Sequence, residues 1–202
     1  MSFRVLHRGG VALVLLALAS FAAHAGAPRN VRPEERALLP RYCNYVQGYV
    51  AGPQAIAEYD RLVKVYGGGW THMHHYCYAL IEIARLDKRS IARPAGYASP
   101  GGALDNIDYV LRNTEPGFTP RAEILARKAR LQARYISVSD AFETADLLVQ
   151  EWPQYPDGYV IQAELLLKAG ERDKAMKVLD VGAQTVADKD RFDKLKGLLN
   201  LN

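Results

Sequence analysis

Residues 156–189 read PDGYVIQAELLLKAGERDKAMKVLDVGAQTVADK, and this stretch decides the fold class. Pro156 is typical of a helix start, and the apolar residues that follow recur at helical spacing. Gly170 predicts a tight turn, because glycine adopts the backbone conformations that end helices without steric penalty. A second helix is predicted from Glu171 to about Thr185. The stretch therefore predicts two helices joined by a short turn.

The same organisation recurs 34 residues earlier in the chain. Residues 122–155 predict one helix from Pro120 to about Tyr135, and a second that begins after Ser137 or Ser139 and ends at Glu151. Sliding one stretch onto the other aligns identical residues, among them Ala129 with Ala163, Leu131 with Leu165, Ala141 with Ala175, and Asp146 with Asp180. The periodicity supports an internal repeat more strongly than these identities do.

Helix pairs that repeat every 34 residues resemble the tetratricopeptide repeat (TPR) family. The aromatic Tyr159, the small residues Ala163 and Ala175 and the turn residue Gly170 are the strongest matches. The resemblance implies an all-α fold, in which antiparallel helix pairs stack into a TPR-like superhelix. It extends over residues 70–202 and is clearest at 122–189, and residues 189–199 are expected to form a C-terminal capping helix.

Upstream of the repeats, residues 26–69 predict an N-terminal helical segment. One helix is expected from Glu35 to Val50 with a break at Pro40, and another from Pro53 to Tyr66, before three consecutive glycines. Helices at 70–86 and 102–113 are expected to form a further pair. No segment shows the strict alternation of polar and apolar residues that a half-buried strand requires.

Residues 1–25 have the three parts of a secretory signal peptide. A basic region with Arg4 and Arg8 precedes a short apolar run, and Ala23-His24-Ala25 is a small-x-small cleavage site. Cleavage lowers the formal net charge from +4 to +2, which is too low to indicate a nucleic-acid-binding protein. The mature protein is expected to be periplasmic or secreted and not to span a membrane. An uncleaved membrane anchor is the alternative.

The chain has two cysteines, Cys43 and Cys77. An exported protein with an even number of cysteines usually pairs them, so a disulfide is expected. Free thiols or metal ligands are the alternatives. The disulfide would attach the N-terminal segment to the helix that starts near Trp70.

Three histidines lie in the stretch GGWTHMHHYCYALIEI at 69–84. On a helix, His72 and His75 are three apart on one face, and His74 lies on another. The His72/His75 pair predicts at most a small Zn or Cu site, and no other cofactor is expected. Alternatively, the histidines pack against aromatic neighbours, bond helix ends or contact water. The absence of a C-x-x-C-H motif excludes covalently attached haem.

The resemblance also implies a groove that holds an extended peptide or a helix of a partner protein. The positions carried over to this groove include a ladder of three arginines, Arg127, Arg130 and Arg134, which suits an acidic segment. Alternatively, Glu123 and Glu164 neutralise these arginines within a solvated helix face. The other predicted groove residues are Asp157, Tyr159, Ile161, Glu164 and Lys168.

Seven of the twelve tyrosines lie between Tyr42 and Tyr78. Tyrosine combines apolar area with a polar tip, so this concentration predicts either an interface or a partly hydrated core around the disulfide. No nucleophile motif or phosphate-binding loop is present, so the sequence does not predict an enzyme. It predicts an exported adaptor or scaffold that binds a protein or peptide in an envelope complex. The alternative is a protein that handles a metal or cofactor with His72, His74 and His75.

Overall fold

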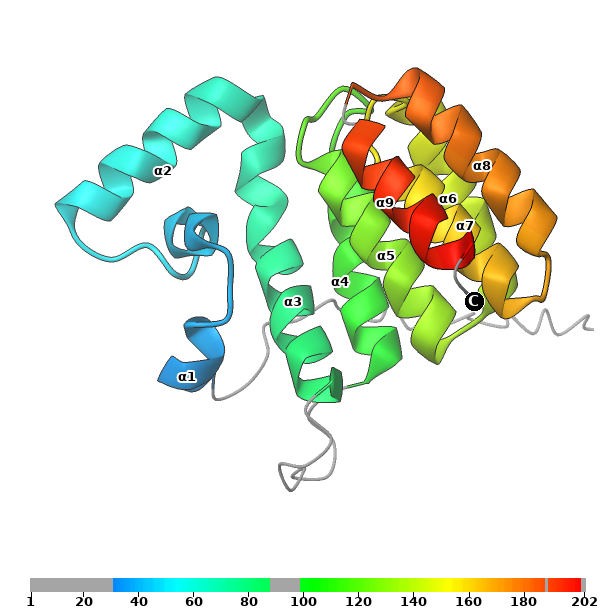
Figure 1. Cartoon of the computed structure of the whole chain (residues 1–202). Coiled ribbons are helices and arrows are strands. Elements are labelled where there is room, and N and C mark those ends of the chain that lie inside the picture. The colour runs from blue at the N-terminus through cyan, green and yellow to red at the C-terminus, as the bar shows by residue number, and fades with distance from the viewer. Residues whose placement is uncertain (1–30, 88–98, 188, 201–202) are drawn as a thin grey trace, which may run out of the picture.

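The computed structural model describes residues 31–87, 99–187 and 189–200, and within these ranges the protein is all-helical, with no strand (Figure 1). The fold class predicted from periodicity is therefore confirmed at this level. The helices are α1 (Pro33–Arg36), α2 (Pro53–Tyr66), α3 (Met73–Asp87), α4 (Pro100–Arg112), α5 (Arg121–Tyr135), α6 (Val138–Glu151), α7 (Asp157–Lys168), α8 (Arg172–Thr185) and α9 (Lys189–Asn200), with two short 3₁₀ helices, η1 (Arg41–Tyr45) and η2 (Gly67–His72).

The helices from α3 to α8 pack as consecutive pairs, which lie side by side in Figure 1. The largest interfaces join α3 to α4, α5 to α6, and α7 to α8. The second helix of each pair also contacts the helix that follows it, and α5 contacts α7 directly. α2 instead contacts η1 and η2, and extends away from α3.

Local sequence signals in the repeats start and end helices where expected. Gly170 has a φ of 77°, and its N–H and that of Glu171 donate to the carbonyls of Leu167 and Leu166, a Schellman arrangement that closes α7. The hydroxyl of Ser137 accepts a hydrogen bond from the N–H of Asp140 at 3.3 Å and caps α6. The predictions for both residues are confirmed.

The small residues of the repeats lie in the core. Ala129 and Ala141 are fully buried where α5 meets α6, and Ala163 and Ala175 are buried between α7 and α8. An alanine at such a position lets the helices approach closely, because a larger side chain would need space that a close-packed interior does not have.

The prediction of a helix from Glu35 to Val50 is wrong for most of the segment, although the expected break at Pro40 is present. The segment contains only the last two residues of α1 and the five of η1, and Pro40 between them is extended, with a ψ of 144°. Side chains of this segment are attached to α3, through the Cys43–Cys77 disulfide and an ion pair of Glu35. These tertiary contacts fix a compact, irregular path that local periodicity does not reveal.

The start of α3 also differs from the expectation. The predicted helix begins at Trp70, whereas residues 67–72 form η2 and α3 begins at Met73. A β-carbon on Gly69 would lie 2.8 Å from a ring carbon of Phe118, so glycine allows this ring to pack against η2. Trp70 is buried in the same turn.

Gly182 lies inside α8, where an alanine would ordinarily favour the helix. A β-carbon there would lie 2.5 Å from a ring carbon of Phe192, which is fully buried and comes from α9. We expect Gly182→Ala to lower the free energy of unfolding by about 2 kcal/mol, because the ring must move out of a packed site. Urea denaturation measures the change.

The matched control is Gly197→Ala on α9, where an added β-carbon has no neighbour within 4 Å among the described residues. This variant should be neutral or more stable by up to about 1 kcal/mol, as helix propensity predicts. Equal responses of the two variants would show that Gly182 is not needed for the docking of Phe192.

Candidate functional site

The candidate site is the surface of α5 on which side chains from η1, α3, α7 and α9 meet. We call this surface the α5 face. Its polar members are Tyr42, Tyr76, Glu123, Arg127, Arg130, Asp157 and Arg191. It contains two members of the predicted arginine ladder.

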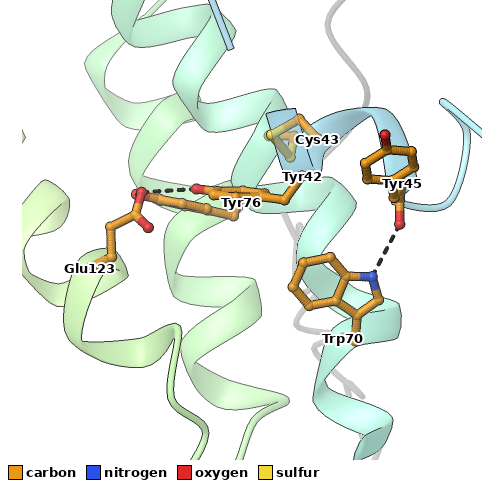
Figure 2. The surroundings of a disulfide bond; sticks show 7 residues. Tyr42, Cys43, Tyr45, Trp70, Tyr76 and Glu123 are labelled. Carbon is orange, nitrogen blue, oxygen red and sulfur yellow. Dashed lines mark hydrogen bonds between the residues drawn. A yellow bond between two sulfur atoms is a disulfide. The ribbon is translucent and has the colours of Figure 1, made fainter. Parts of the chain in front are cut away.

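Glu123 accepts hydrogen bonds from two tyrosines at once. Its Oε1 lies 2.8 Å from the hydroxyl of Tyr42 and 3.0 Å from that of Tyr76, and Figure 2 shows both rings directed at this carboxylate. Burial and the negative charge of Glu123 raise the pKa of Tyr76 well above its usual value, although the nearby Arg127 opposes the rise. Both hydroxyls therefore remain protonated donors, and the carboxylate links η1 and α3 to α5.

A disulfide places Tyr42 within reach of Glu123. Cys43 and Cys77 are bonded with a Cα–Cα distance of 5.8 Å, and both are buried, so the predicted pairing is confirmed. The indole N–H of Trp70 donates to the carbonyl oxygen of Tyr45 at 3.1 Å and holds the other end of η1 (Figure 2). The concentration of tyrosines around Cys43 thus builds a partly polar core, which is one of the two predicted alternatives.

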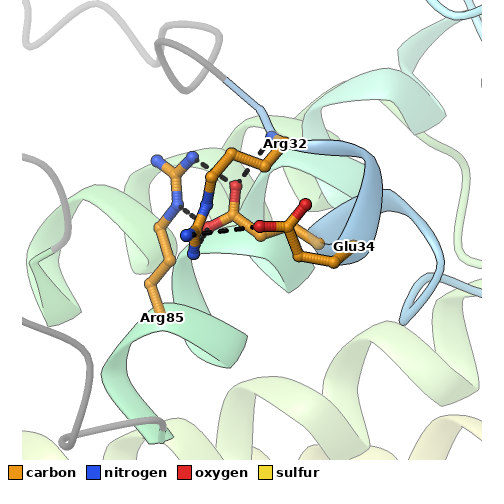
Figure 3. Close-up of polar contacts among 4 residues, drawn as sticks. Arg32, Glu34 and Arg85 are labelled. Atoms are coloured by element: carbon orange, nitrogen blue, oxygen red, sulfur yellow. Dashed lines mark hydrogen bonds and ion pairs between the residues drawn. The ribbon is translucent and has the colours of Figure 1, made fainter.

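An ion pair between Glu35 of α1 and Arg85 of α3 also attaches the N-terminal segment to α3. The guanidinium of Arg85 on α3 donates two hydrogen bonds to Glu35, at 2.8 and 2.9 Å, and the backbone N–H of Arg32 donates a third (Figure 3). The hydrogen bonds from Arg85 are the main reason that the pKa of Glu35 falls to about 2, against the effect of burial. Glu35 is therefore a charged, almost fully buried link.

Asp157 at the start of α7 is shared by two arginines. Its carboxylate lies 2.8 Å from Arg130 of α5 and 2.6 Å from Arg191 of α9. Burial alone would raise the pKa of Asp157, but the hydrogen bonds and charges of the two arginines outweigh it and lower the pKa. Asp157 therefore stays ionised and connects α5, α7 and α9.

The arginine ladder is thus largely paired within the protein. Arg130 is bound to Asp157, and Arg134 lies 2.5 Å from Asp87 at the end of α3, where the hydroxyl of Tyr135 also donates. The sequence predicted Glu123 and Glu164 as the neutralising groups. The ion-pairing carboxylates instead come from two neighbouring helices, which local spacing on α5 does not reveal.

The other predicted groove residues divide into core and surface. Tyr159 and Ile161 are 4% and 1% exposed. The ring of Tyr159 packs against Phe192, and its hydroxyl donates to the carbonyl oxygen of Pro153. Tyr159 and Ile161 are therefore core residues and are not exposed in a groove. Glu164 and Lys168 are exposed.

The three histidines are half-buried at the start of α3. The rings of His74 and His75 are 4.4 Å apart between centres, and His75 packs at 3.9 Å against Tyr109 of α4. His72 meets the edge of the same tyrosine ring at 5.6 Å. Burial, and then the proximity of His75, lower the pKa of both His72 and His74. The alternative prediction of packing against aromatic neighbours therefore describes what these rings do.

No group of three or more His, Cys, Asp or Glu side chains suited to a metal ion occurs in residues 31–87, 99–187 and 189–197. The closely placed pair is His74 with His75, although the sequence placed His72 and His75 on one helical face. Adjacent residues on an ideal helix diverge, so helical projection alone does not predict this approach.

Glu82 on α3 is a buried carboxyl that is not among the predicted site residues. It is 9% exposed, and its Oε2 has no hydrogen-bond partner among the described residues. Burial raises the pKa of Glu82 to about 7, and Asp105 adds to the rise while Arg85 opposes it. The only sequence signal for Glu82 is an acidic residue between two apolar ones, Ile81 and Ile83.

Neither protein-family models, nor curated proteins, nor solved structures contain a match to this chain. In the described ranges, none of the helices combines the length and the apolar character needed to cross a membrane.

Proposed function

We propose that this protein is an exported helical-repeat adaptor of the TPR type, which binds a segment of a partner protein beside the α5 face in the cell envelope. The role is binding and not catalysis. Arg134, Glu164 and Lys168 form the exposed part of the contact surface. The observation that carries the proposal is that α5 and α7, the first helices of two successive pairs, and the last helix α9 are joined through the single carboxylate of Asp157.

The packing of the helices supports a TPR-like superhelix. Stacked repeats require contacts within each pair, between successive pairs and between the first helices of neighbouring pairs. Contacts of all three kinds occur here, as α5 with α6, α6 with α7, and α5 with α7. α9 extends the series by contacting α8, as a capping helix would.

The exposed charges support binding of a polar, charged segment. The ion pair between Arg134 and Asp87 is about half exposed on both sides, so it contributes little to stability, about 0–1 kcal/mol. A carboxylate of a partner can replace Asp87 at this guanidinium without a large energetic penalty. Lys168 offers a second positive charge, on α7.

The Cys43–Cys77 disulfide supports an oxidising compartment, because such bonds persist mainly in exported proteins. The predicted signal peptide at residues 1–25 supports the same location, and it lies outside the described residues. Together these features favour the periplasm or the extracellular space.

Reversal of the two exposed positive charges tests the binding surface. We expect Arg134→Glu with Lys168→Glu to reduce the partner recovered by affinity purification from the native envelope at least tenfold, because both contacts become repulsive. A photo-crosslinking residue at position 164 should give a single crosslinked partner, identified by mass spectrometry. Arg127 and Arg130 are left unchanged, because they contact groups that hold the fold together.

The matched control carries Arg172→Glu and Lys177→Glu, the same change of charge at two exposed positions of α8. It should retain the partner, and a photo-crosslinking residue at position 177 should give no such product. Equal recovery from both charge-reversal variants would contradict the proposed binding surface.

A further inference from the structure

Two histidine rings at the start of α3 have their protonation pattern fixed by hydrogen bonds. Nδ1 of His74 lies 2.8 Å from the carbonyl oxygen of Thr71, which can only accept a hydrogen bond. The Nδ1 atom of neutral His74 must therefore carry the proton. Its other ring nitrogen, Nε2, keeps its lone pair.

His75 is held in the same tautomer by a side chain. Its Nδ1 lies 2.7 Å from Oδ1 of Asn106 on α4. The amide nitrogen of Asn106 donates to the carbonyl of Gly102 at 3.2 Å, which fixes the orientation of the amide and leaves Oδ1 as the acceptor. Nε2 of neutral His75 therefore also keeps its lone pair.

This pattern is the one found around metal-binding histidines. A histidine that ligates a metal through one nitrogen nearly always donates its other N–H to an oxygen acceptor, which is a carboxylate, a backbone carbonyl or water. In this protein a backbone carbonyl serves His74 and an amide oxygen serves His75. The two rings are thus supported before any metal binds.

The separation of the rings fits two adjacent positions around one ion. With a metal–nitrogen bond of about 2 Å, each ring centre lies about 3.2 Å from the metal, and two metal–nitrogen bonds at a right angle place the ring centres about 4.5 Å apart. The observed distance between the centres of His74 and His75 is 4.4 Å. Right-angled nitrogen ligands are typical of Cu²⁺ and Ni²⁺.

We propose that His74 and His75 bind one divalent transition-metal ion through their two Nε2 atoms, with water in the remaining positions. Cu²⁺ is expected to bind most tightly at this site, because it binds nitrogen donors more tightly than the other divalent ions of its series. This metal site is separate from the proposed binding of a partner protein, and it uses no residue of the α5 face. Tyr109 packs on His75 and limits the motion of its ring.

Titration of the purified protein with Cu²⁺ tests the site, followed by calorimetry and by electron paramagnetic resonance. We expect one Cu²⁺ per chain with two nitrogen ligands, and at least a tenfold weaker affinity after His74→Ala or His75→Ala. His72→Ala is the matched control and should bind as the unaltered protein does. Zn²⁺ should bind more weakly at the same residues.

Absence of stoichiometric Cu²⁺ binding would overturn the proposal, and so would unchanged binding in the two alanine variants. Loss of binding in His72→Ala equal to that in His75→Ala would overturn the choice of this pair. Circular dichroism of each variant establishes that the fold is retained.

Asn106 is a positioning residue in this scheme, and it has a separate test. Asn106→Ala should weaken Cu²⁺ binding roughly tenfold, as loss of an outer hydrogen-bond partner usually does. Asn106→Asp keeps an acceptor oxygen for Nδ1 and should restore binding. Equal binding by Asn106→Ala and the unaltered protein would remove Asn106 from the site.

Discussion

Replacing both Cys43 and Cys77 by alanine is expected to lower the free energy of unfolding by about 4 kcal/mol. The bond joins residues that are 34 apart in the sequence, and opening a loop of this size increases the conformational entropy of the unfolded chain. Alanine is the suitable replacement because both positions are buried and a hydroxyl there would lack a partner. Urea denaturation followed by circular dichroism measures the change.

The same variant reports on the position of η1. Trp70 is 2% exposed and bonds the carbonyl of Tyr45, so release of η1 should shift its fluorescence to longer wavelength. Trp152→Phe in both proteins removes the only other tryptophan. Reduced, unaltered protein is the control and should resemble the alanine variant. A loss of stability below about 1 kcal/mol would show that the tyrosine and ion-pair contacts hold the segment without the bond.

Glu82→Gln is expected to stabilise the protein at alkaline pH, with an effect that approaches about 3 kcal/mol above pH 7. The folded protein keeps a proton on Glu82 up to about pH 7, whereas the unfolded chain releases it near pH 4.5. Since the folded state binds more protons between these values, the stability of the unaltered protein should decrease as pH rises from 4.5 to 7. Glutamine is neutral at every pH and removes this decrease.

Thermal denaturation from pH 4 to pH 9 measures the difference between the two proteins. The matched control is Glu143→Gln on α6, an exposed carboxylate, which should leave the pH profile unchanged. If Glu82→Gln fails to raise the stability at pH 8, the pKa of Glu82 in the folded protein is not raised, and its environment differs from the one described.

The repeat region was predictable because its helices are defined by local signals. Proline starts, the caps at Ser137 and Gly170 and the apolar spacing all act within a few residues, and the observed helices match those signals. The pairing of Cys43 with Cys77 was predictable because they are the two cysteines of a chain with a predicted export signal. Membership of the TPR family, which the 34-residue period suggests, remains a prediction.

The N-terminal segment and the charges of the α5 face were not predictable in the same way. Tyr42 and Glu123 are 81 residues apart, and Arg191 and Asp157 are 34 apart. The short stretches over which a helical pattern is recognised therefore never include both partners. Burial of Tyr159 and Ile161 also depends on α9 and on neighbouring helices. Local periodicity identifies an apolar face but does not say which residues at its edge become covered.

The hydrogen bond between Tyr42 and Glu123 has a consequence for the order in which the chain becomes structured. During synthesis the N-terminal segment emerges first, yet its acceptor on α5 follows 81 residues later. Closing a loop of this length carries an entropic penalty, so we expect the Tyr42–Glu123 bond to form after the shorter-range links of η1 to α3 and η2, which span 34 residues at the disulfide and 25 at Trp70. Until α5 is in place the hydroxyl of Tyr42 lacks its acceptor, so we expect the contact between the N-terminal segment and α5 to complete the fold after η1 has docked on α3.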